Sequence, residues 1–347
     1  MRRLFIILFS FIFITSCAKK YTPRVFDSVS IKTFTIDSTS IRSIVAVDSE
    51  TVYFAGSIGD IGFTNNGGKT WSRKFLKYDD SIVPHFRSIA KNKMGLFVLS
   101  IGNPALLYKI TENDTSIVYK EEHNKVFYDA MDFFDDGKHG IAVGDPIEDC
   151  ASIIITKDGG NSWKKIPCDK LPKFEDGEAF FAASNTNIKT LGSSVWIASG
   201  GKKSRIIRSD DYGNTWKIFD TPIIQGVGPQ GIYSIDMANF RNGIVFGGDF
   251  SKPNENKANK AITINGGKTW TLVSDGNEPN YKSCVQYVPF TNGKEVFSVG
   301  KTGLSFSNDG GITWKKVSNE AFYAIQFVDK YVAWLSGNNK IGKLYLD

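Results

Sequence analysis

The chain has 347 residues and a formal net charge of +6, with 42 lysine and arginine residues against 36 aspartate and glutamate residues. This small excess is spread along the sequence, which predicts an ordinary solvated surface and argues against a nucleic-acid-binding protein. Aromatic residues make up 13% of the chain and there are 33 glycines. No sustained helical apolar stripe is visible, so the composition favours one large all-β domain over two ordinary domains.

The N-terminus has the pattern of an export signal. Arg2 and Arg3 precede an apolar run, residues 4–15, that is too short to cross a bilayer as a stable helix. The run ends in Ile-Thr-Ser-Cys at residues 14–17, which resembles the bacterial lipobox. We predict a signal peptide at residues 1–16 and lipidation of Cys17, which would lower the formal charge from +6 to +4. The alternative is a plain signal peptide with a chance cysteine.

Residues 17–28 are polar and without periodicity, so we expect a short tether between the lipid and the fold. No acidic residue follows Cys17 directly. We therefore expect the protein in the bacterial cell envelope, lipid-anchored to the outer membrane and facing the periplasm. A lipid chain contributes about 0.8 kcal/mol per buried methylene, so a multiply acylated cysteine anchors an otherwise soluble chain firmly. Residues 29–347 are predicted to form a single domain.

Five segments match the pattern [ST]-x-[DN]-x-G-x-[ST]-W, known as the Asp-box: residues 64–71, 156–163, 209–216, 263–270 and 307–314. The acidic or amide side chain can accept hydrogen bonds from the backbone ahead of it, and the glycine can take the positive φ that closes a turn. The tryptophan can bury on the order of 200 Å² against a neighbouring sheet. The predicted structural residues are Asn66, Trp71, Asp158, Trp163, Asp211, Trp216, Asn265, Trp270, Asp309 and Trp314. An alternative role in binding a metal or substrate is disfavoured because each polar side chain is used by its own turn.

The tryptophan spacing indicates how many units there are. The interval from Trp71 to Trp163 is 92 residues, about twice the later intervals of 53, 54 and 44, so a unit with a degraded box at residues 111–114 lies between them. Aligning the second strands gives seven units, of which the last has only three strands. Residues 29–36 alternate apolar and polar and can supply the missing strand. We therefore predict an all-β, seven-bladed β-propeller closed by the N-terminal strand, which removes exposed sheet edges.

These repeats resemble the BNR or Asp-box repeats of the sialidase-like superfamily. Residues 30–347 resemble more closely the photosystem II stability and assembly factor type of propeller, through Gly-Ile-Ala-Val-Gly-Asp-Pro at 140–146, the segment 178–187 and Gly-Gly-Asp at 247–249. Bacterial lipoproteins of this type are often labelled oxidoreductase or glycosyl hydrolase without demonstrated chemistry. The resemblance implies a platform that binds a partner protein during assembly.

Sites on propellers usually lie where the inner strands begin, on the face opposite the Asp-boxes. The aligned residues there are Arg42, Arg87, Asp129, Ala179 with Glu178 beside it, Tyr233, Ser283 and Tyr323. Two arginines on adjacent units could bind an anion or a carboxylate-bearing partner. The alternative is a water-filled channel lined by mutually satisfied polar groups. Loops expected on the same face add Asp145, Lys202, Lys203, Arg205 and Asp249 as candidates.

Catalysis has weaker support. A sialidase needs three arginines around one carboxylate, a Tyr–Glu pair and an acid, and Arg42 lacks the Arg-Ile-Pro context of the first of those arginines. A carboxyl pair made by Asp129 with Glu178 or Asp145 is a candidate for glycoside hydrolysis. Residues 226–231 match G-x-G-x-x-G but contain a proline and precede a strand, not a helix, so they do not predict a dinucleotide site.

The histidines and cysteines predict no metal or haem site, and we expect no cofactor. Cys150 and Cys168 flank one Asp-box hairpin and could bridge in an oxidising periplasm, or remain two unpaired thiols. Cys284 is expected to be a small buried residue. The sequence thus favours a monomeric, non-catalytic envelope protein that presents a propeller face to a protein, or else a glycan. The alternative is a hydrolase of the sialidase-like type, which we favour over a true oxidoreductase.

Overall fold

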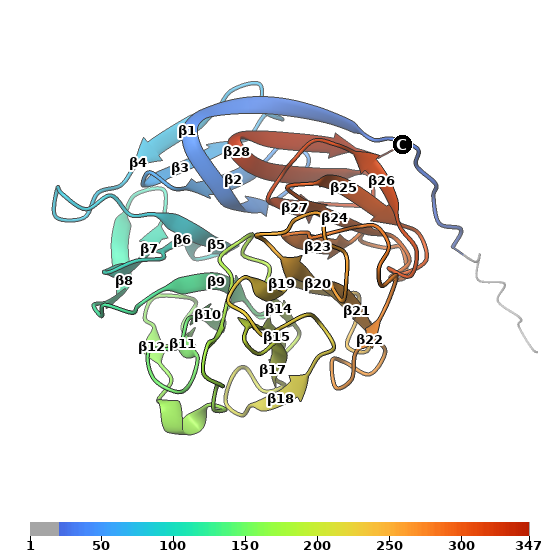
Figure 1. Ribbon diagram of the computed structural model, residues 1–347. Helices are drawn as coiled ribbons and strands as arrows, with labels where there is room; N and C mark the ends of the chain where they lie inside the picture. Colours follow the sequence, from blue (N-terminus) through green and yellow to red (C-terminus); the bar gives the residue numbers. More distant parts are fainter. Residues whose placement is uncertain (1–20, 347) are drawn as a thin grey trace, which may run out of the picture.

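The computed structural model describes residues 21–346, so the expected signal peptide and the lipidated Cys17 lie outside the described residues. Within this range the chain is all-β, apart from one short 3-10 helix, η1 (Cys168–Lys170). Antiparallel sheets are arranged radially around a central axis, which confirms a β-propeller (Figure 1). Among residues 21–346, no helix has the length and apolarity needed to cross a membrane.

The strands fall into six hydrogen-bonded sheets. One six-stranded sheet contains β27 (Ala324–Phe327), β28 (Val332–Tyr345), β1 (Ser30–Ala46), β2 (Val52–Gly56), β3 (Asp60–Thr64) and β4 (Ser72–Phe75). The next two are β5 (Phe86–Asn92), β6 (Gly95–Ser100), β7 (Ala105–Ile110) and β8 (Thr115–Glu121), and then β9 (Tyr128–Phe133), β10 (Gly140–Gly144), β11 (Ser152–Thr156) and β12 (Lys164–Lys165).

The other three sheets follow in chain order. One contains β14 (Ile188–Leu191), β15 (Ser194–Ala198), β17 (Arg205–Ser209) and β18 (Lys217–Asp220). A six-stranded sheet contains β13 (Glu178–Ala179), β16 (Gly200–Gly201), β19 (Gln230–Met237), β20 (Gly243–Asp249), β21 (Lys260–Thr263) and β22 (Thr271–Leu272). The last contains β23 (Cys284–Tyr287), β24 (Val296–Gly300), β25 (Gly303–Ser307) and β26 (Lys315–Ser318).

The prediction of seven blades is wrong, because the structure has six sheets. The difference arises where the chain ends meet. Residues 30–35 of β1 pair with residues 340–345 of β28, whereas residues 41–46 of the same strand pair with β2. The first and last sequence units are therefore joined through β1 into one sheet. Counting repeated strand patterns in the sequence cannot detect such a ladder, because its hydrogen bonds continue from one unit into the next.

The two ends of the chain hold the ring together at this sheet. The two halves of β28 lie side by side, since the Leu346 N–H donates to the Tyr331 carbonyl. The C-terminal half of β28 pairs in turn with β1 (Figure 1). The alternating pattern of residues 29–36 predicted this pairing of the N-terminal strand with the last unit. The pairing leaves neither β1 nor the C-terminal half of β28 as a free edge.

The Asp-box hairpins use their polar side chains internally. Asp158 accepts hydrogen bonds from the Thr156 hydroxyl at 2.7 Å, the Ser162 N–H at 3.0 Å and the Ser162 hydroxyl at 2.6 Å. Although burial opposes the shift, these hydrogen bonds lower the pKa of Asp158 to about 2. Equivalent bonds occur at Asn66, Asp211, Asn265 and Asp309. These side chains are thus engaged in their own turns.

The tryptophan of each box packs into the seam between its own repeat unit and the preceding one, and for Trp71 both units belong to the sheet that contains β1. Trp163 has its ring centroid 6.5 Å from Phe97 on β6 and 5.9 Å from Phe133 on β9. Trp71 lies between Phe54 on β2 and Trp334 on β28. Trp216, Trp270 and Trp314 occupy the corresponding clusters. Each aromatic ring therefore buries apolar surface from two repeat units at once.

The last unit has no Asp-box, and its seam is filled by the N-terminal segment. Phe26 lies 4.9 Å from Phe306 on β25 and 6.3 Å from Phe297 on β24, measured between ring centroids. Arg24 anchors this segment through Glu295, with Nη2–Oε2 at 2.6 Å, and the Tyr21 hydroxyl donates to the same carboxylate. Residues 21–28, part of the predicted tether, therefore lie against the propeller.

We predict that Phe26→Ala lowers the free energy of unfolding by about 1–3 kcal/mol, because a half-buried aromatic ring leaves the seam. Urea unfolding followed by tryptophan fluorescence measures the change. Phe290→Ala is the matched control, since that side chain is 82% exposed. Equal unfolding midpoints for the two variants would contradict a structural role for Phe26.

Candidate functional site

Four inner strands carry a one-residue β-bulge at the same end of the ring. The ladder register skips Arg42 between β1 and β2, Arg87 between β5 and β6, Asp129 between β9 and β10, and Tyr233 between β19 and β20. A bulge bends its strand and redirects the side chain of the extra residue. Four of the residues predicted to line the mouth of the channel thus occupy one repeated structural position.

The segment of residues 181–187, which we call the central segment, crosses the axis of the ring. Asn185 accepts a hydrogen bond from the Met131 N–H on β9 at 2.8 Å and donates to the Ile89 carbonyl on β5 at 3.1 Å. Ser184 donates to the Ser283 carbonyl at 2.6 Å, and the Thr186 and Ser234 hydroxyls are 2.7 Å apart. The segment therefore ties several inner strands together and does not leave an open channel at this level.

The alignment of inner strands made from the sequence is wrong in the fourth unit. Ala179 and Glu178 lie on β13, which pairs with β16, whereas the inner strand of this unit is β14. The mouth position predicted for the fourth unit is therefore wrong, and sequence reasoning missed the crossing segment. Its signal is the run of small and polar residues at 182–187 between Phe181 and Ile188, which suits a backbone packed closely among strands.

The two arginines lie together above the central segment. Arg87 Nη1 donates to the Ala182 carbonyl at 2.9 Å, and Arg42 Nη1 lies 3.5 Å from the Ala183 carbonyl. The Arg42 guanidinium carbon is 4.0 Å from the centroid of the Tyr323 ring. Burial and the positive charge of Arg42 lower the pKa of Arg87 to about 10. Two partly desolvated cations therefore repel each other at the centre of the face.

Neither arginine has a carboxylate partner among the described residues. Arg24, Arg73, Arg205 and Arg208 each form an ion pair, whereas within residues 21–346 no such pair involves Arg42 or Arg87. The Arg42 Nε is buried without a hydrogen-bond partner in the same range. A negatively charged group arriving from outside would relieve both the mutual repulsion and the unmet hydrogen bond.

Two carboxyl groups near the arginines are held in unfavourable surroundings. Burial, then the charge of Asp145, raises the pKa of Asp129 well above its usual value, although Arg87 and the Ala182 backbone partly oppose the shift. Neither carboxyl oxygen of Asp129 has a hydrogen-bond partner of good geometry among the described residues. Burial raises the pKa of Asp145 to about 6, although its Oδ1 accepts the Phe180 N–H at 2.8 Å. Asp129 thus favours its neutral form and neutralises the arginines poorly.

The remaining groups at the mouth are a histidine and two tyrosines. Burial, Arg87 and Arg42 together lower the pKa of His85 to about 4, so its ring is neutral at neutral pH and can accept from Arg87 Nε at 3.3 Å. Tyr233 stacks on Phe181 with centroids 3.9 Å apart, and its hydroxyl donates to the Pro229 carbonyl at 2.8 Å. Tyr233 therefore supports the central segment from one side, while Tyr323 lies under Arg42.

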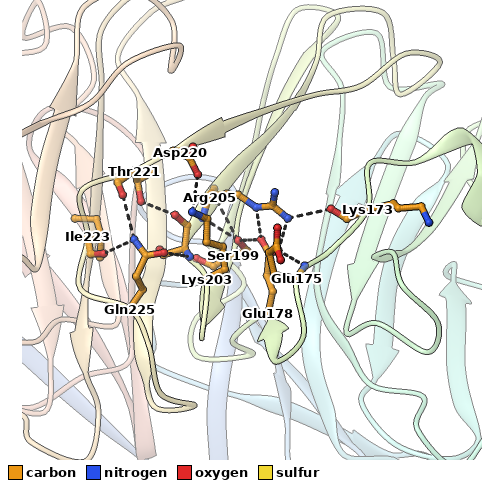
Figure 2. A network of polar contacts seen from close by, with 11 residues as sticks. Lys173, Glu175, Glu178, Ser199, Lys203, Arg205, Asp220, Thr221, Ile223 and Gln225 are labelled. Atoms are coloured by element: carbon orange, nitrogen blue, oxygen red, sulfur yellow. Dashed lines mark hydrogen bonds and ion pairs between the residues drawn. The ribbon is translucent and has the colours of Figure 1, made fainter.

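Glu178 and Arg205 form a separate buried pair (Figure 2). Arg205 donates to Glu178 through Nε at 3.1 Å and also through Nη2, and the Ser199 hydroxyl and Glu175 N–H donate to the same carboxylate. The Glu178 side chain is 0% exposed and that of Arg205 is 10% exposed. Both groups are held by hydrogen bonds to each other and to their neighbours, so the structure gives this pair a scaffolding role.

The other loop candidates are also engaged locally. Lys202 pairs with Asp176 and Lys203 with Asp220, at 2.8 and 2.9 Å (Figure 2 shows the second pair). Asp249 accepts the Ser251 N–H at 2.9 Å. The structure joins Cys150 and Cys168 in a disulfide and leaves Cys284 buried. In the part of the chain that the structure describes, no group of three or more His, Cys, Asp or Glu side chains is placed to hold a metal ion.

Comparisons with known proteins support this architecture. The family described as BNR/Asp-box repeat matches residues 305–316. A solved structure of YCF48 bound to D1 peptide is similar over 93% of this chain and 100% of its own, with a TM-score of 0.66 at 15% identity. YCF48 from Cyanidioschyzon merolae is similar over 91% of this chain and 98% of its own, with a TM-score of 0.56 at 14% identity.

The likeness extends to propellers of other kinds. The WD40 repeats of RRP9 have a TM-score of 0.66 at 11% identity and cover 94% of this chain and 100% of their own. No curated protein matches the sequence. Since all these identities are low, the structural likeness shows the propeller fold, and the chain is a β-propeller with an Asp-box repeat.

We predict that Glu178→Ala lowers the free energy of unfolding by about 3–5 kcal/mol, because it leaves a buried arginine unpaired. Asp176→Ala, which breaks the exposed pair with Lys202, is the control and should change stability little. Thermal or urea unfolding of both variants provides the measurement. A Glu178→Ala protein as stable as the control would argue that this pair is not part of the scaffold.

Proposed function

We propose that this protein is a non-catalytic binding or assembly factor that takes a carboxylate-bearing segment of a partner protein at the mouth formed by Arg42 and Arg87. The observation that carries the proposal is the pair of adjacent, partly buried guanidinium groups with no ion pair among the described residues. Charge-assisted hydrogen bonds from arginine to a carboxylate contribute about 1.5–3 kcal/mol each, and two such groups can bind one carboxylate from both sides.

The form of the site favours binding over catalysis. The central segment lies directly below the arginines, and its backbone carbonyls accept hydrogen bonds from them. A bound group would therefore rest on the face and would not enter a deep cleft. Glu178, one of the two carboxyls considered as a partner for Asp129, is occupied by Arg205. A group that rests on the face in this way suits a protein segment better than a sugar ring enclosed for hydrolysis.

Similarity to a peptide-binding propeller adds to this proposal. YCF48, in the solved structure that is similar over nearly the whole length of this chain, is bound to a D1 peptide. A protein partner is therefore the natural expectation for this chain as well. We extend the proposal to the cell envelope, where Cys17 would carry lipid and hold the propeller at the outer membrane on its periplasmic side.

Replacing both arginines tests the binding site. In crosslinking from native membranes, Arg42→Gln with Arg87→Gln should reduce recovery of the partner at least tenfold, because two charged donors are lost. The matched control is Arg241→Gln with Lys268→Gln, which removes two exposed cations elsewhere. Mass spectrometry identifies the partners, and urea unfolding verifies the fold. Recovery of the same partners in equal amounts by both double variants would overturn the proposal.

Lipid anchoring is tested separately at Cys17. Growth with an alkyne analogue of palmitate should label the wild-type protein and not Cys17→Ser, and the variant should leave the membrane fraction, because acyl chains supply the membrane affinity. Cys284→Ser is the control for loss of a cysteine alone. Labelling that persists in Cys17→Ser would refute lipidation at this position without affecting the binding proposal.

A further inference from the structure

One seam between sheets lacks both a box tryptophan and a substitute for it. In the second unit, the turn between β7 and β8 consists of residues 111–114, closed by the Thr111 N–H donating to the Asp114 carbonyl at 2.9 Å. No tryptophan follows this turn. The seam between the strands β1–β4 and the sheet β5–β8 is therefore built differently from the seams that Trp71, Trp163, Trp216, Trp270 and Trp314 fill.

At this place the structure has a groove of about 920 Å³. Its apolar lining comes from both sides of the seam: Tyr53, Ile61 and Phe63 on β2 and β3, and Leu96 and Ile110 on β6 and β7. Its rim carries Arg73, Lys74, Lys91 and Lys93, against a single acidic residue, Glu112. The groove thus combines an aromatic floor with a positively charged rim.

The seam of the last unit shows what such a floor can bind. Tyr53 lies opposite Phe63 in the ladder of β2 and β3, and Phe297 lies opposite Phe306 at the corresponding register of β24 and β25. The second aromatic pair is covered by Phe26. The first pair is stacked at 5.4 Å between centroids, and within residues 21–346 no third aromatic ring lies over it. The N-terminal segment, with Phe26 over the aromatic pair, therefore already occupies the equivalent place once in this molecule.

The charges near the two aromatic pairs differ and indicate the chemistry of the occupant. Phe26 arrives with Arg24, whose partner Glu295 immediately precedes β24. The corresponding residue before β2 is Thr51, which has no charge. Arg73 is already paired with Asp60, so Lys74, Lys91 and Lys93 supply the available positive charge. A segment that fits this groove should therefore carry acidic residues beside its aromatic ring, whereas the N-terminal segment carries Arg24 near Phe26.

We propose that the groove between β1–β4 and β5–β8 binds a segment of a partner protein in which one aromatic side chain is flanked by acidic residues. The ring would stack on Tyr53 and Phe63 as Phe26 does on Phe297 and Phe306, and the carboxylates would face the lysines of the rim. The groove lies where β5 ends, whereas Arg87 lies near the start of that strand, so this surface is distinct from the mouth and does not depend on the function proposed for it.

The test uses the full chain without its signal peptide and a fluorescein-labelled peptide, Asp-Glu-Phe-Glu-Asp, followed by fluorescence anisotropy. We expect saturable binding that weakens with added salt, and at least a tenfold loss of affinity when alanine replaces the phenylalanine of the peptide. Lys74→Glu with Lys93→Glu should weaken binding at least tenfold. Lys164→Glu with Lys217→Glu, an equal charge change at other exposed positions, should not.

Two further variants separate the possible outcomes. Phe63→Ala should weaken binding while circular dichroism shows an intact fold, and Phe290→Ala, which removes an exposed aromatic ring outside the groove, should bind this peptide as the wild type does. Equal affinity for the phenylalanine and alanine peptides, or equal weakening by both lysine double variants, would overturn the proposal. So would sedimentation showing that the groove is closed by a second copy of the chain, with dimerisation lost in Lys74→Glu with Lys93→Glu.

Discussion

The fold depends on aromatic rings that bridge neighbouring sheets. A sheet of four short strands has too little buried surface to be stable alone, so each one relies on the sheets beside it. A tryptophan that buries about 150–250 Å² in a seam contributes roughly 4–6 kcal/mol as an upper bound. Because the turn that carries the ring is closed by its own Asp-box, the ring is held in position against the preceding unit. Phe26 fills a seam in the same way, although it comes from a segment without an Asp-box.

A ring stabilised in this way can tolerate unfavourable features at its centre. The bulges place Arg42, Arg87, Asp129 and Tyr233 at the same position of four inner strands, and carbonyls of the central segment contact both arginines. The repelling arginines and a buried carboxyl without good hydrogen bonds cost stability that the seams must offset. Groups kept in such a state are commonly those that meet a ligand, which is why the mouth is a better candidate than the satisfied pair of Glu178 and Arg205.

The sequence was most informative where a feature repeats, although the single strand pattern of residues 29–36 also predicted the pairing of the N-terminal strand with the last unit. Box spacing predicted the hairpins and the propeller, and the same alignment placed Arg42, Arg87, Asp129 and Tyr233 at equivalent positions. The blade number was wrong because hydrogen bonding through β1 joins the first and last units into one sheet. The central segment has no periodicity to reveal it, and the ion pair of Glu178 with Arg205 depends on long-range geometry that no local pattern contains.

The two seams without a box tryptophan lie at different places on the ring and differ in what fills them. The seam beside β24 and β25 binds the N-terminal segment through Arg24 and Phe26, while the seam beside β2 and β3 lies on the other side of the sheet that contains β1 (Figure 1). If Cys17 carries lipid as proposed, at most about 25 Å of extended chain separates the lipid from Arg24. The β24–β25 side would then be held near the membrane, which would leave the groove of the second unit farther from it and accessible to a soluble partner.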